Sequence, residues 1–261
     1  MSSKRQPRSR SPSKVAPARK PPRRPGRPQA AGGVDLRGRL LDSAIELYAE
    51  RGIAATPLRA IAQRAGVTPA LLHYYFASRS SLVETILAER VAPFVAVSVA
   101  PLLAPLPSPR ATLRKFLETH MRNLAANPWM PRLMVREVLS EGGSLRENMQ
   151  AQFAAVISPK TLMLIAAAQR CGEIRSDLNP LLTGISLISL AVFPFAAAPV
   201  WREVALSTFN GLPEPVMKAI RARQAQMKSM HAGAPGWDVL IEHTLTLFDG
   251  MLEKPHAKTK T

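Results

Sequence analysis

The pattern of apolar and polar residues predicts an all-helical protein. In the first regular segment, apolar residues recur at i, i+3, i+4 and i+7 (Leu41, Ala44, Ile45 and Tyr48), which gathers their side chains on one face of a helix. Gly52 follows this stripe and suits the left-handed conformation that often ends helices. No segment shows a convincing strand pattern, so the fold class that we expect is all-α.

Three start signals divide the next residues into short helices. Thr56-Pro57 and Thr68-Pro69 each place a capping hydroxyl before a proline, the pair favoured at the N-cap and the first helical position. Gly66 lies between the two helices that these pairs begin, where a tight turn is needed. Ser78 is a suitable N-cap for a further helix that continues to Leu87. The spacing therefore predicts two short helices joined by a three-residue turn, the arrangement of a helix-turn-helix.

The rest of the chain also has a helical pattern, with many prolines. Prolines at 101, 105, 107 and 109 predict a connector, and a Pro-Trp-Met-Pro turn is expected at 128–131. The helices that we expect begin at Ser108-Pro109, follow the turn at 128–131, run from Ser144 to about Gly172 with an interruption at Pro159, run from Pro180 to about Val192 with a break near Pro194, and run from about Trp237 to Leu252.

Residues 1–35 differ from the rest of the chain in composition. They hold seven prolines and almost no large apolar side chains, so folding would bury too little surface to offset the loss of chain entropy. Residues 1–39 carry twelve Lys or Arg and one acid, and the whole chain has a net charge of +17. We therefore expect a disordered basic arm over residues 1–35 and a polyanionic partner.

One segment of this arm is similar to a known minor-groove motif. Residues 23–28, Arg-Arg-Pro-Gly-Arg-Pro, resemble the Gly-Arg-Pro core of AT-hook segments, in which an extended arginine lies in the narrow minor groove of A·T-rich DNA. The match is partial, because Pro25 stands where a second arginine would be ideal. Two interpretations stay open: Arg27 reads the minor groove, or the arm only adds non-specific affinity.

Several classes of protein do not fit the sequence. Cys171 is the single cysteine, so an intrachain disulfide or a cysteine-based zinc site cannot form. The basic N-terminus is not followed by the apolar region of a secretory signal. Residues 178–201 carry no charged side chain and are long enough to span a bilayer, but their prolines favour a buried helix, with a membrane-attached regulator as the alternative. We expect no membrane partner and a cytoplasmic, nucleoid-associated protein.

Enzymatic motifs are missing from the sequence. It contains no nucleophile elbow, P-loop, dinucleotide-binding glycine motif or zinc-ligand spacing, and its five histidines are scattered. We therefore expect that the protein is not an enzyme and uses no metal or other cofactor.

Residues 39–87 resemble the N-terminal DNA-binding domain of the TetR family of transcriptional regulators. The matching features are the Ala-x-x-Leu-Tyr run at 44–48, Gly52, Thr56, Ile61-Ala62, Ala65-Gly66-Val67, the aromatic cluster that ends in Phe76, and Ser78 followed by a basic residue. The resemblance implies a helix-turn-helix domain over residues 36–90 and a ligand-sensing and dimerisation domain over residues 91–253. Residues 254–261 are then expected to form a flexible tail.

The resemblance also implies roles for individual residues. Thr56, Arg59 and Arg79 would contact phosphates, and Tyr74 and Tyr75 would press on the sugar-phosphate backbone. The positions of the recognition helix that enter the major groove would be Thr68, Pro69, Ala70, Leu71 and His73, whereas Leu72 and Phe76 are expected in the core. Many family members have tyrosine in place of His73, and this helix has few groups that hydrogen-bond base edges. Readout is therefore expected to rest on thymine methyl groups, His73 and DNA shape.

In the sensing domain, the resemblance extends to the layout only. It implies a pocket enclosed by helices and a two-fold dimer, which we assign to the helices at 180–192 and 237–252. The candidates for the pocket wall are His120, Trp129, Met130, Met134, Phe153, Met163 and Phe193. Such residues more often form a core than a ligand site, and that alternative stays open. A mainly apolar pocket would favour a hydrophobic or amphipathic effector.

The function that follows is a ligand-responsive repressor that binds a palindromic operator on double-stranded DNA. A small effector would shift the separation of the two recognition helices of the homodimer and so release the operator. The alternative is a constitutive or nucleoid-type DNA-binding protein without a small-molecule effector.

Overall fold

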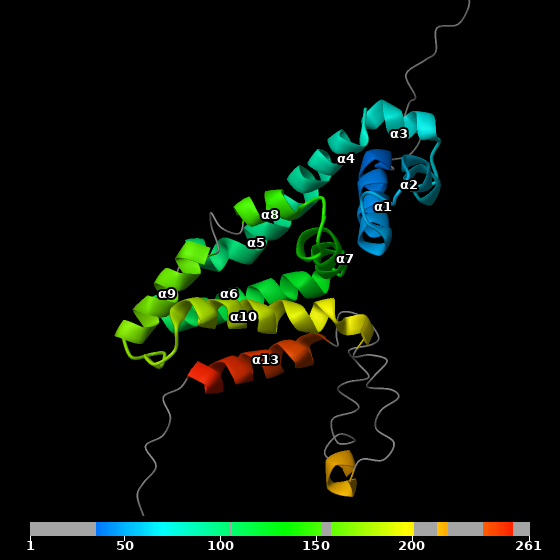
Figure 1. The fold of residues 1–261 in the computed structure, drawn as a ribbon. Coiled ribbons are helices and arrows are strands. Elements are labelled where there is room, and N and C mark those ends of the chain that lie inside the picture. The colour runs from blue at the N-terminus through cyan, green and yellow to red at the C-terminus, as the bar shows by residue number, and fades with distance from the viewer. Residues whose placement is uncertain (1–34, 105, 153–157, 201–212, 219–236, 253–261) are drawn as a thin grey trace, which may run out of the picture. The chain divides into compact units, whose positions relative to one another are not determined.

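The computed structural model describes residues 35–104, 106–152, 158–200, 213–218 and 237–252. Within these ranges the regular structure is helical throughout, which confirms the predicted all-α class (Figure 1). The predicted arm and tail, with Arg27 and Phe153, lie outside the described residues, so these expectations stay predictions.

The helices follow one another in chain order with few long connections. They are α1 (Leu36–Arg51), α2 (Leu58–Arg64), α3 (Pro69–Tyr75), α4 (Arg79–Ile86), the π-helical turn η1 (Leu87–Val91), α5 (Ala92–Leu103), α6 (Pro109–Ala126), α7 (Trp129–Met134), the π-helical turn η2 (Val135–Leu139), α8 (Arg146–Gln152), α9 (Ser158–Arg170), α10 (Pro180–Ala196) and α13 (Trp237–Leu252). Because α4, η1 and α5 are continuous, the predicted domain boundary at residue 90 falls inside one helical stretch.

Most predicted helix starts are confirmed by side-chain caps. The hydroxyls of Thr68, Ser78 and Ser108 accept hydrogen bonds from backbone N–H groups three residues later, at 3.3, 3.1 and 3.0 Å. The predicted N-cap at Thr56 is wrong, because Pro57 is the N-cap of α2 and its side chain makes no capping bond. The Thr56 hydroxyl donates instead to the Gly52 carbonyl at 2.6 Å.

Three prolines that were expected to interrupt helices lie inside them. Pro131 is in the first turn of α7, where a missing N–H has no helical partner to lose. Pro101 and Pro194 lie in α5 and α10 close to their C-terminal ends. The predicted turn at 128–131 is wrong from Trp129 onward, because α7 begins there. The predicted connector lies between Leu103 and Pro109 and so begins after Pro101, and the break predicted near Pro194 lies two residues later, where α10 ends at Ala196.

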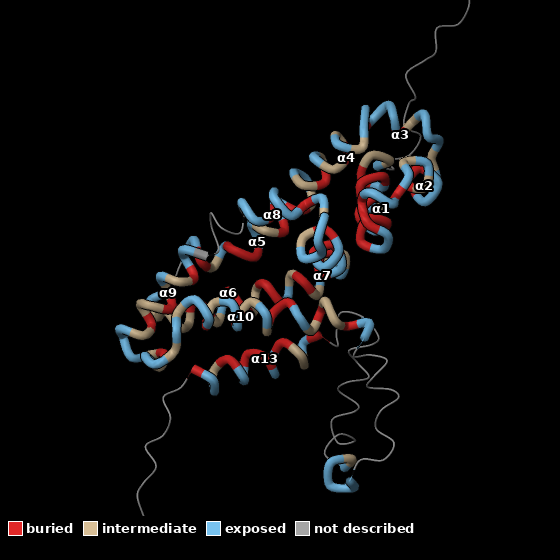
Figure 2. Tube along the Cα trace, viewed as in Figure 1, coloured by how far each residue is buried: buried red, intermediate tan, exposed pale blue. Residues whose placement is uncertain are grey.

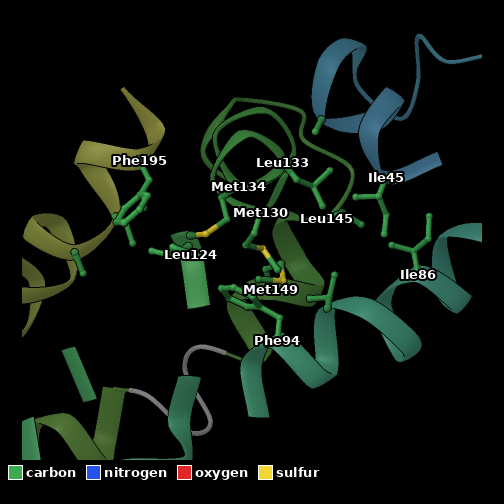
Figure 3. Close-up of a cluster of buried hydrophobic side chains, with 14 of the residues drawn as sticks. Ile45, Ile86, Phe94, Leu124, Met130, Leu133, Met134, Leu145, Met149 and Phe195 are labelled. Atoms are coloured by element: carbon green, nitrogen blue, oxygen red, sulfur yellow. The ribbon is translucent and has the colours of Figure 1, made fainter. Parts of the chain in front are cut away.

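Among the described residues, the larger of two hydrophobic clusters runs from α1 to α13. Buried positions lie on the faces where helices meet, as Figure 2 shows. In Figure 3, Ile45 of α1 and Ile86 of α4 lie near Met130 and Leu133 of α7, with Leu145 beside them. Met130 and Met134 belong to this core, so the side chains of α7 join the N-terminal helices to the later ones.

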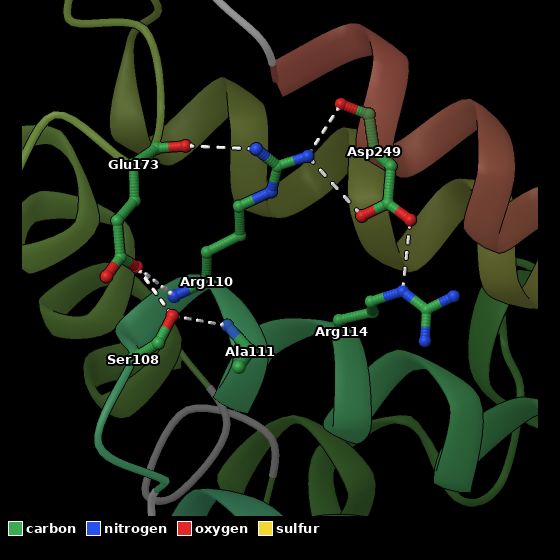
Figure 4. A network of polar contacts seen from close by, with 6 residues as sticks. All are labelled: Ser108, Arg110, Ala111, Arg114, Glu173 and Asp249. Atoms are coloured by element: carbon green, nitrogen blue, oxygen red, sulfur yellow. Dashed lines mark hydrogen bonds and ion pairs between the residues drawn. The ribbon is translucent and has the colours of Figure 1, made fainter.

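A polar network holds α13 against the start of α6. Arg110 donates to the Asp249 main-chain carbonyl at 2.9 Å, and Arg114 Nε donates to the Asp249 carboxylate at 3.0 Å (Figure 4). The Glu173 carboxylate accepts from the Ser108 hydroxyl and from the Arg110 backbone N–H at 2.8 and 2.9 Å. These bonds join the start of α6 to α13 and to Glu173, which follows the end of α9, within one protomer.

The apolar segment that sequence analysis examined as a membrane span forms α10, a helix of 17 residues. A different stretch, Arg79–Leu103, is long and apolar enough to cross a membrane by length and composition, and one third of its most apolar window is buried in this fold. Part of its apolar character is explained by Phe94, Val99 and Leu102, which are buried in the helical core.

Candidate DNA-binding and effector sites

The turn between α2 and α3 depends on Gly66. Its φ of +67° is the left-handed conformation that favours glycine. The Val67 N–H bonds to the Ala62 carbonyl at 3.0 Å, and the Gly66 N–H bonds to the Gln63 carbonyl at 3.1 Å, which together form a Schellman ending. Arg39 of α1 donates to the Ala65 carbonyl at 2.7 Å, so the end of α2 is tied to α1.

Helix α3 exposes its N-terminal residues and buries one face against the core. Leu72 is fully buried, and Phe76 is buried just beyond the helix, as predicted. Thr68, Pro69, Ala70 and His73 are exposed, and Leu71 is half-buried. These five predicted contact positions therefore lie on the accessible N-terminal part of α3, and a major groove is wide enough to admit a helix.

Two tyrosines extend this accessible surface. Tyr74 is 81% exposed, and its ring packs edge-to-face on Tyr75 at 5.4 Å between ring centroids. An exposed tyrosine in a soluble fold presents both an apolar ring and a hydroxyl donor to a partner. Arg59 of α2 is also exposed. The proposed contacts of Tyr74, Tyr75 and Arg59 with the DNA backbone stay predictions.

The expected phosphate contact of Thr56 is wrong. Its side chain is completely buried, and its hydroxyl donates to the main-chain carbonyl of Gly52 at 2.6 Å. A hydroxyl that is sealed inside the fold cannot reach a phosphate. Thr56 therefore stabilises the loop between α1 and α2 (the α1–α2 loop, residues 52–57).

Arg79 is also committed to this loop. Its guanidinium donates to the carbonyls of Ile53, Ala54 and Thr56 at 3.1, 2.9 and 3.0 Å. These bonds use three of the five N–H donors of the guanidinium and hold it on the loop, so the structure gives the expected phosphate contact no support. Arg79 instead ties the start of α4 to the α1–α2 loop.

The effector candidates do not form one group. Met130 and Met134 are buried in the core that joins α1 to α7. Met163 and Phe193 are 69% and 68% exposed, so the expectation that they line an enclosed pocket is wrong for this chain. The apolar side chain at each of these two positions lies on the outward face of its helix.

His120 is the candidate whose environment is most unusual. It is 5% exposed, with its ring stacked on Phe116 and edge-to-face with Phe94, each at 6.0 Å between centroids. Among the described residues, its Nδ1 atom has no hydrogen-bond partner. Burial lowers the pKa of His120 to about 4, so the ring is neutral near pH 7. A buried polar atom without a partner costs free energy that a ligand could recover.

Next to Phe94 lies a cleft of about 520 Å³. Its lining residues are Asp42, Ile45, Glu46, Glu89, Arg90, Pro93, Phe94, Val97, Asn123, Asn127 and Trp129. Of the residues predicted to form the effector pocket, only Trp129 lines this cleft. The cleft has the size of a small-molecule site and an aromatic wall, because Phe94 and Trp129 lie 6.3 Å apart between ring centroids. No local sequence signal marks it, since its residues come from α1, η1, α5, α6 and α7.

The burial of His120 predicts a loss of stability in weak acid. The unfolded chain binds a proton near pH 6.5, whereas the folded chain binds it only near pH 4, so stability falls as the pH drops from about 6.5 to about 4. Between pH 7.5 and pH 5 the loss should be about 2 kcal/mol. Urea unfolding of the wild type and of His120→Gln at both pH values measures it. An equal change in the two proteins would contradict this assignment.

Comparison with known proteins agrees with this architecture. Residues 40–86 match the family of bacterial regulatory proteins of the tetR type, and residues 109–211 match the tetracyclin repressor-like C-terminal domain. The HTH-type transcriptional regulator UidR of Escherichia coli is 23% identical over 161 residues, covering 59% of this chain and 76% of UidR. The HTH-type transcriptional repressor KstR2 of Mycobacterium tuberculosis is 42% identical over 60 residues, which are 23% of this chain and 30% of KstR2.

Solved structures share the fold at low sequence identity. The ketosteroid transcriptional regulator KstR2 of M. tuberculosis superimposes with a TM-score of 0.60 at 18% identity, covering 87% of this chain and all of KstR2. The transcriptional regulator FadR of Bacillus subtilis, in complex with stearoyl-CoA, gives 0.55 at 14% identity, covering 83% of this chain and all of FadR. With the two family matches together spanning more than half of its residues, the chain belongs to the TetR family of transcriptional regulators.

Proposed function

We propose that this regulator is a homodimeric repressor that binds a palindromic operator in the cytoplasm and leaves it when a hydrophobic or amphipathic effector binds. The observation that carries the proposal is the exposed surface of α3, from its N-terminal end to Tyr74, together with the exposed Arg59 of α2. The buried Leu72 holds α3 on the core, and the exposed residues of α3 are free to enter a major groove.

The face of α10 supports the dimer. Leu182, Ile185 and Phe193 are each more than half exposed, and they recur at helical spacing with the exposed Ser189 between them. Leu247 and Met251 give α13 a similar exposed pair, one turn apart. An apolar face of this extent on two neighbouring helices is the kind of surface that a second subunit covers.

The cleft beside Phe94 supports an effector. Phe94 separates the cleft from the buried His120, whose Nδ1 has no partner among the described residues. An amphipathic molecule could place its apolar part on Phe94 and Trp129, and a polar donor on the Oδ1 atom of Asn127. The NH₂ groups of Asn123 and Asn127 already donate to acceptors within the fold. This placement includes the predicted contact of Trp129, whereas His120 does not line the cleft and its predicted ligand contact stays a prediction.

Selection from random duplexes, followed by affinity measurements at near-cellular salt, tests the function. A regulator should enrich one inverted repeat and prefer it over random DNA by about 10³-fold or more. Equal affinity for all duplexes would favour the alternative of a constitutive, nucleoid-type protein. A chain that lacks residues 1–34 should keep the preference, because the arm supplies charge and not base readout in this proposal.

Arg59 and Arg79 form a matched pair of variants for the phosphate contacts. Arg59→Gln should reduce the slope of log affinity against log salt concentration by about one and leave stability unchanged, because one phosphate contact is lost. Arg79→Gln should lower the free energy of unfolding by about 1–3 kcal/mol, because three carbonyls lose their donor, and should leave the salt slope unchanged. Salt titrations and urea unfolding give both quantities. A reduced slope for Arg79→Gln would restore its phosphate role.

A charge on the α10 face should separate the subunits. Ile185→Arg places a guanidinium in the proposed interface and should convert the dimer into a folded monomer with much weaker operator binding. Leu103→Arg is the matched control, since Leu103 is similarly exposed at the end of α5. Sedimentation velocity and operator titration report the two effects. A dimer that survives Ile185→Arg would move the interface away from α10.

A further inference from the structure

Glu137 of η2 is a buried carboxylate that contacts one distant segment of the chain and the loop that follows its own helix. It is 5% exposed. Its Oε1 accepts a hydrogen bond from the Ile53 N–H at 2.9 Å, and its Oε2 accepts one from the Ser144 N–H at 3.0 Å. Ile53 belongs to the α1–α2 loop, whereas Ser144 belongs to the loop after η2. One side chain therefore connects the DNA-binding helices to the sensing domain.

The local sequence allows the carboxylate to approach this closely. Gly52 has a φ of +90°, and a Cβ atom at that position would lie 3.0 Å from Glu137 Oε1. Any other residue would both strain the backbone and crowd the carboxylate. The approach of Glu137 to the main chain of Ile53 therefore requires a glycine at the preceding position.

The same loop is held from its other side by Arg79. The guanidinium donates hydrogen bonds to the carbonyls of Ile53, Ala54 and Thr56, whereas the Glu137 carboxylate accepts one from the Ile53 N–H. Tyr48 lies in this neighbourhood. Its pKa is raised to about 12 by burial, with Arg79 lowering it and Glu137 raising it. The α1–α2 loop is thus fixed between two charged side chains, one at the start of α4 and one on η2.

We propose that Glu137 is the positioning residue that sets the DNA-binding helices relative to the sensing domain, and hence the separation of the two recognition helices in the dimer. The inference rests on the proposed function. Both bonds come from main-chain N–H groups: the bond from Ile53 fixes the loop that leads directly into α2, and the bond from Ser144 fixes the carboxylate to the loop after η2. A carboxylate is costly to bury, and packing alone would be served as well by an apolar side chain.

Three full-length variants separate positioning from packing. Glu137→Ala removes both acceptors. Glu137→Gln keeps the size and one acceptor oxygen, and it turns an NH₂ group toward one of the two N–H groups. Glu141→Gln is the matched control, because it neutralises an exposed carboxylate in the same connection. Circular dichroism checks that each variant is folded, and Glu137→Gln serves if Glu137→Ala does not fold.

Amide hydrogen exchange tests the bonds themselves, without DNA. In Glu137→Ala the Ile53 and Ser144 amides should exchange about tenfold faster or more, because each loses a charged acceptor. Glu137→Gln should accelerate only one of the two, and Glu141→Gln neither. Amides within α6 should change little in all three variants. Unchanged protection of Ile53 in both Glu137 variants would overturn the proposal.

Operator selection tests the positioning. The wild type and Glu141→Gln should enrich inverted repeats with one half-site spacing, whereas Glu137→Ala should accept several spacings, with Glu137→Gln between them. Faster exchange at Ile53 with an unchanged single spacing would also overturn the proposal, because the bond would then be structural only. A wild type that enriches no sequence would refute the proposed function instead, and the exchange measurement would still decide whether Glu137 holds the loop.

Discussion

The burial of α1 is the interaction on which the rest of the structure depends. Leu40, Leu41 and Ala44 are fully buried, and Ile45 and Tyr48 are nearly so, which leaves this helix covered on more than one side. A helix with a single apolar stripe would pack against one neighbour, but α1 packs against both α2 and α7. The packing of α1 against α2 and α7 therefore fixes the helix-turn-helix to the sensing domain, and the polar contacts add to this packing.

The features that sequence analysis predicted well are those that depend on neighbouring residues. The caps at Thr68, Ser78 and Ser108 and the left-handed turn at Gly66 each involve hydrogen bonds within five residues. The buried and exposed sides of α3 also follow from helical spacing, because Leu72 and Phe76 are four residues apart. The fold class could be predicted for the same reason, since periodicity within each segment determines its type.

The errors concern residues whose partners are distant or whose face is ambiguous. Arg79 bonds to carbonyls 23 to 26 residues earlier, so no local pattern distinguishes this role from a phosphate contact. Phe193 shows the second problem. An apolar stripe at helical spacing looks the same whether it faces a core, a pocket or a second subunit, and only the packed chain shows that this one faces outward. The cleft could not be predicted for the first reason, because its lining residues are spread along the chain from Asp42 to Trp129.

The cleft and the Glu137 contact lie on the same two elements. Asp42 and Ile45 of α1 line the cleft, and α1 leads into the loop that Glu137 holds. Trp129 lines the cleft as well, and it begins the continuous helical stretch of α7 and η2 that carries Glu137. A molecule that fills the cleft would contact both of these elements. Glu137 joins them through a hydrogen bond in which its side-chain carboxylate accepts from the Ile53 N–H, so a relative movement of the two elements would act on the α1–α2 loop. The movement would pass from this loop to the start of α2 and then to the recognition helix. A proposed effector and an operator would therefore favour opposite arrangements of the loop.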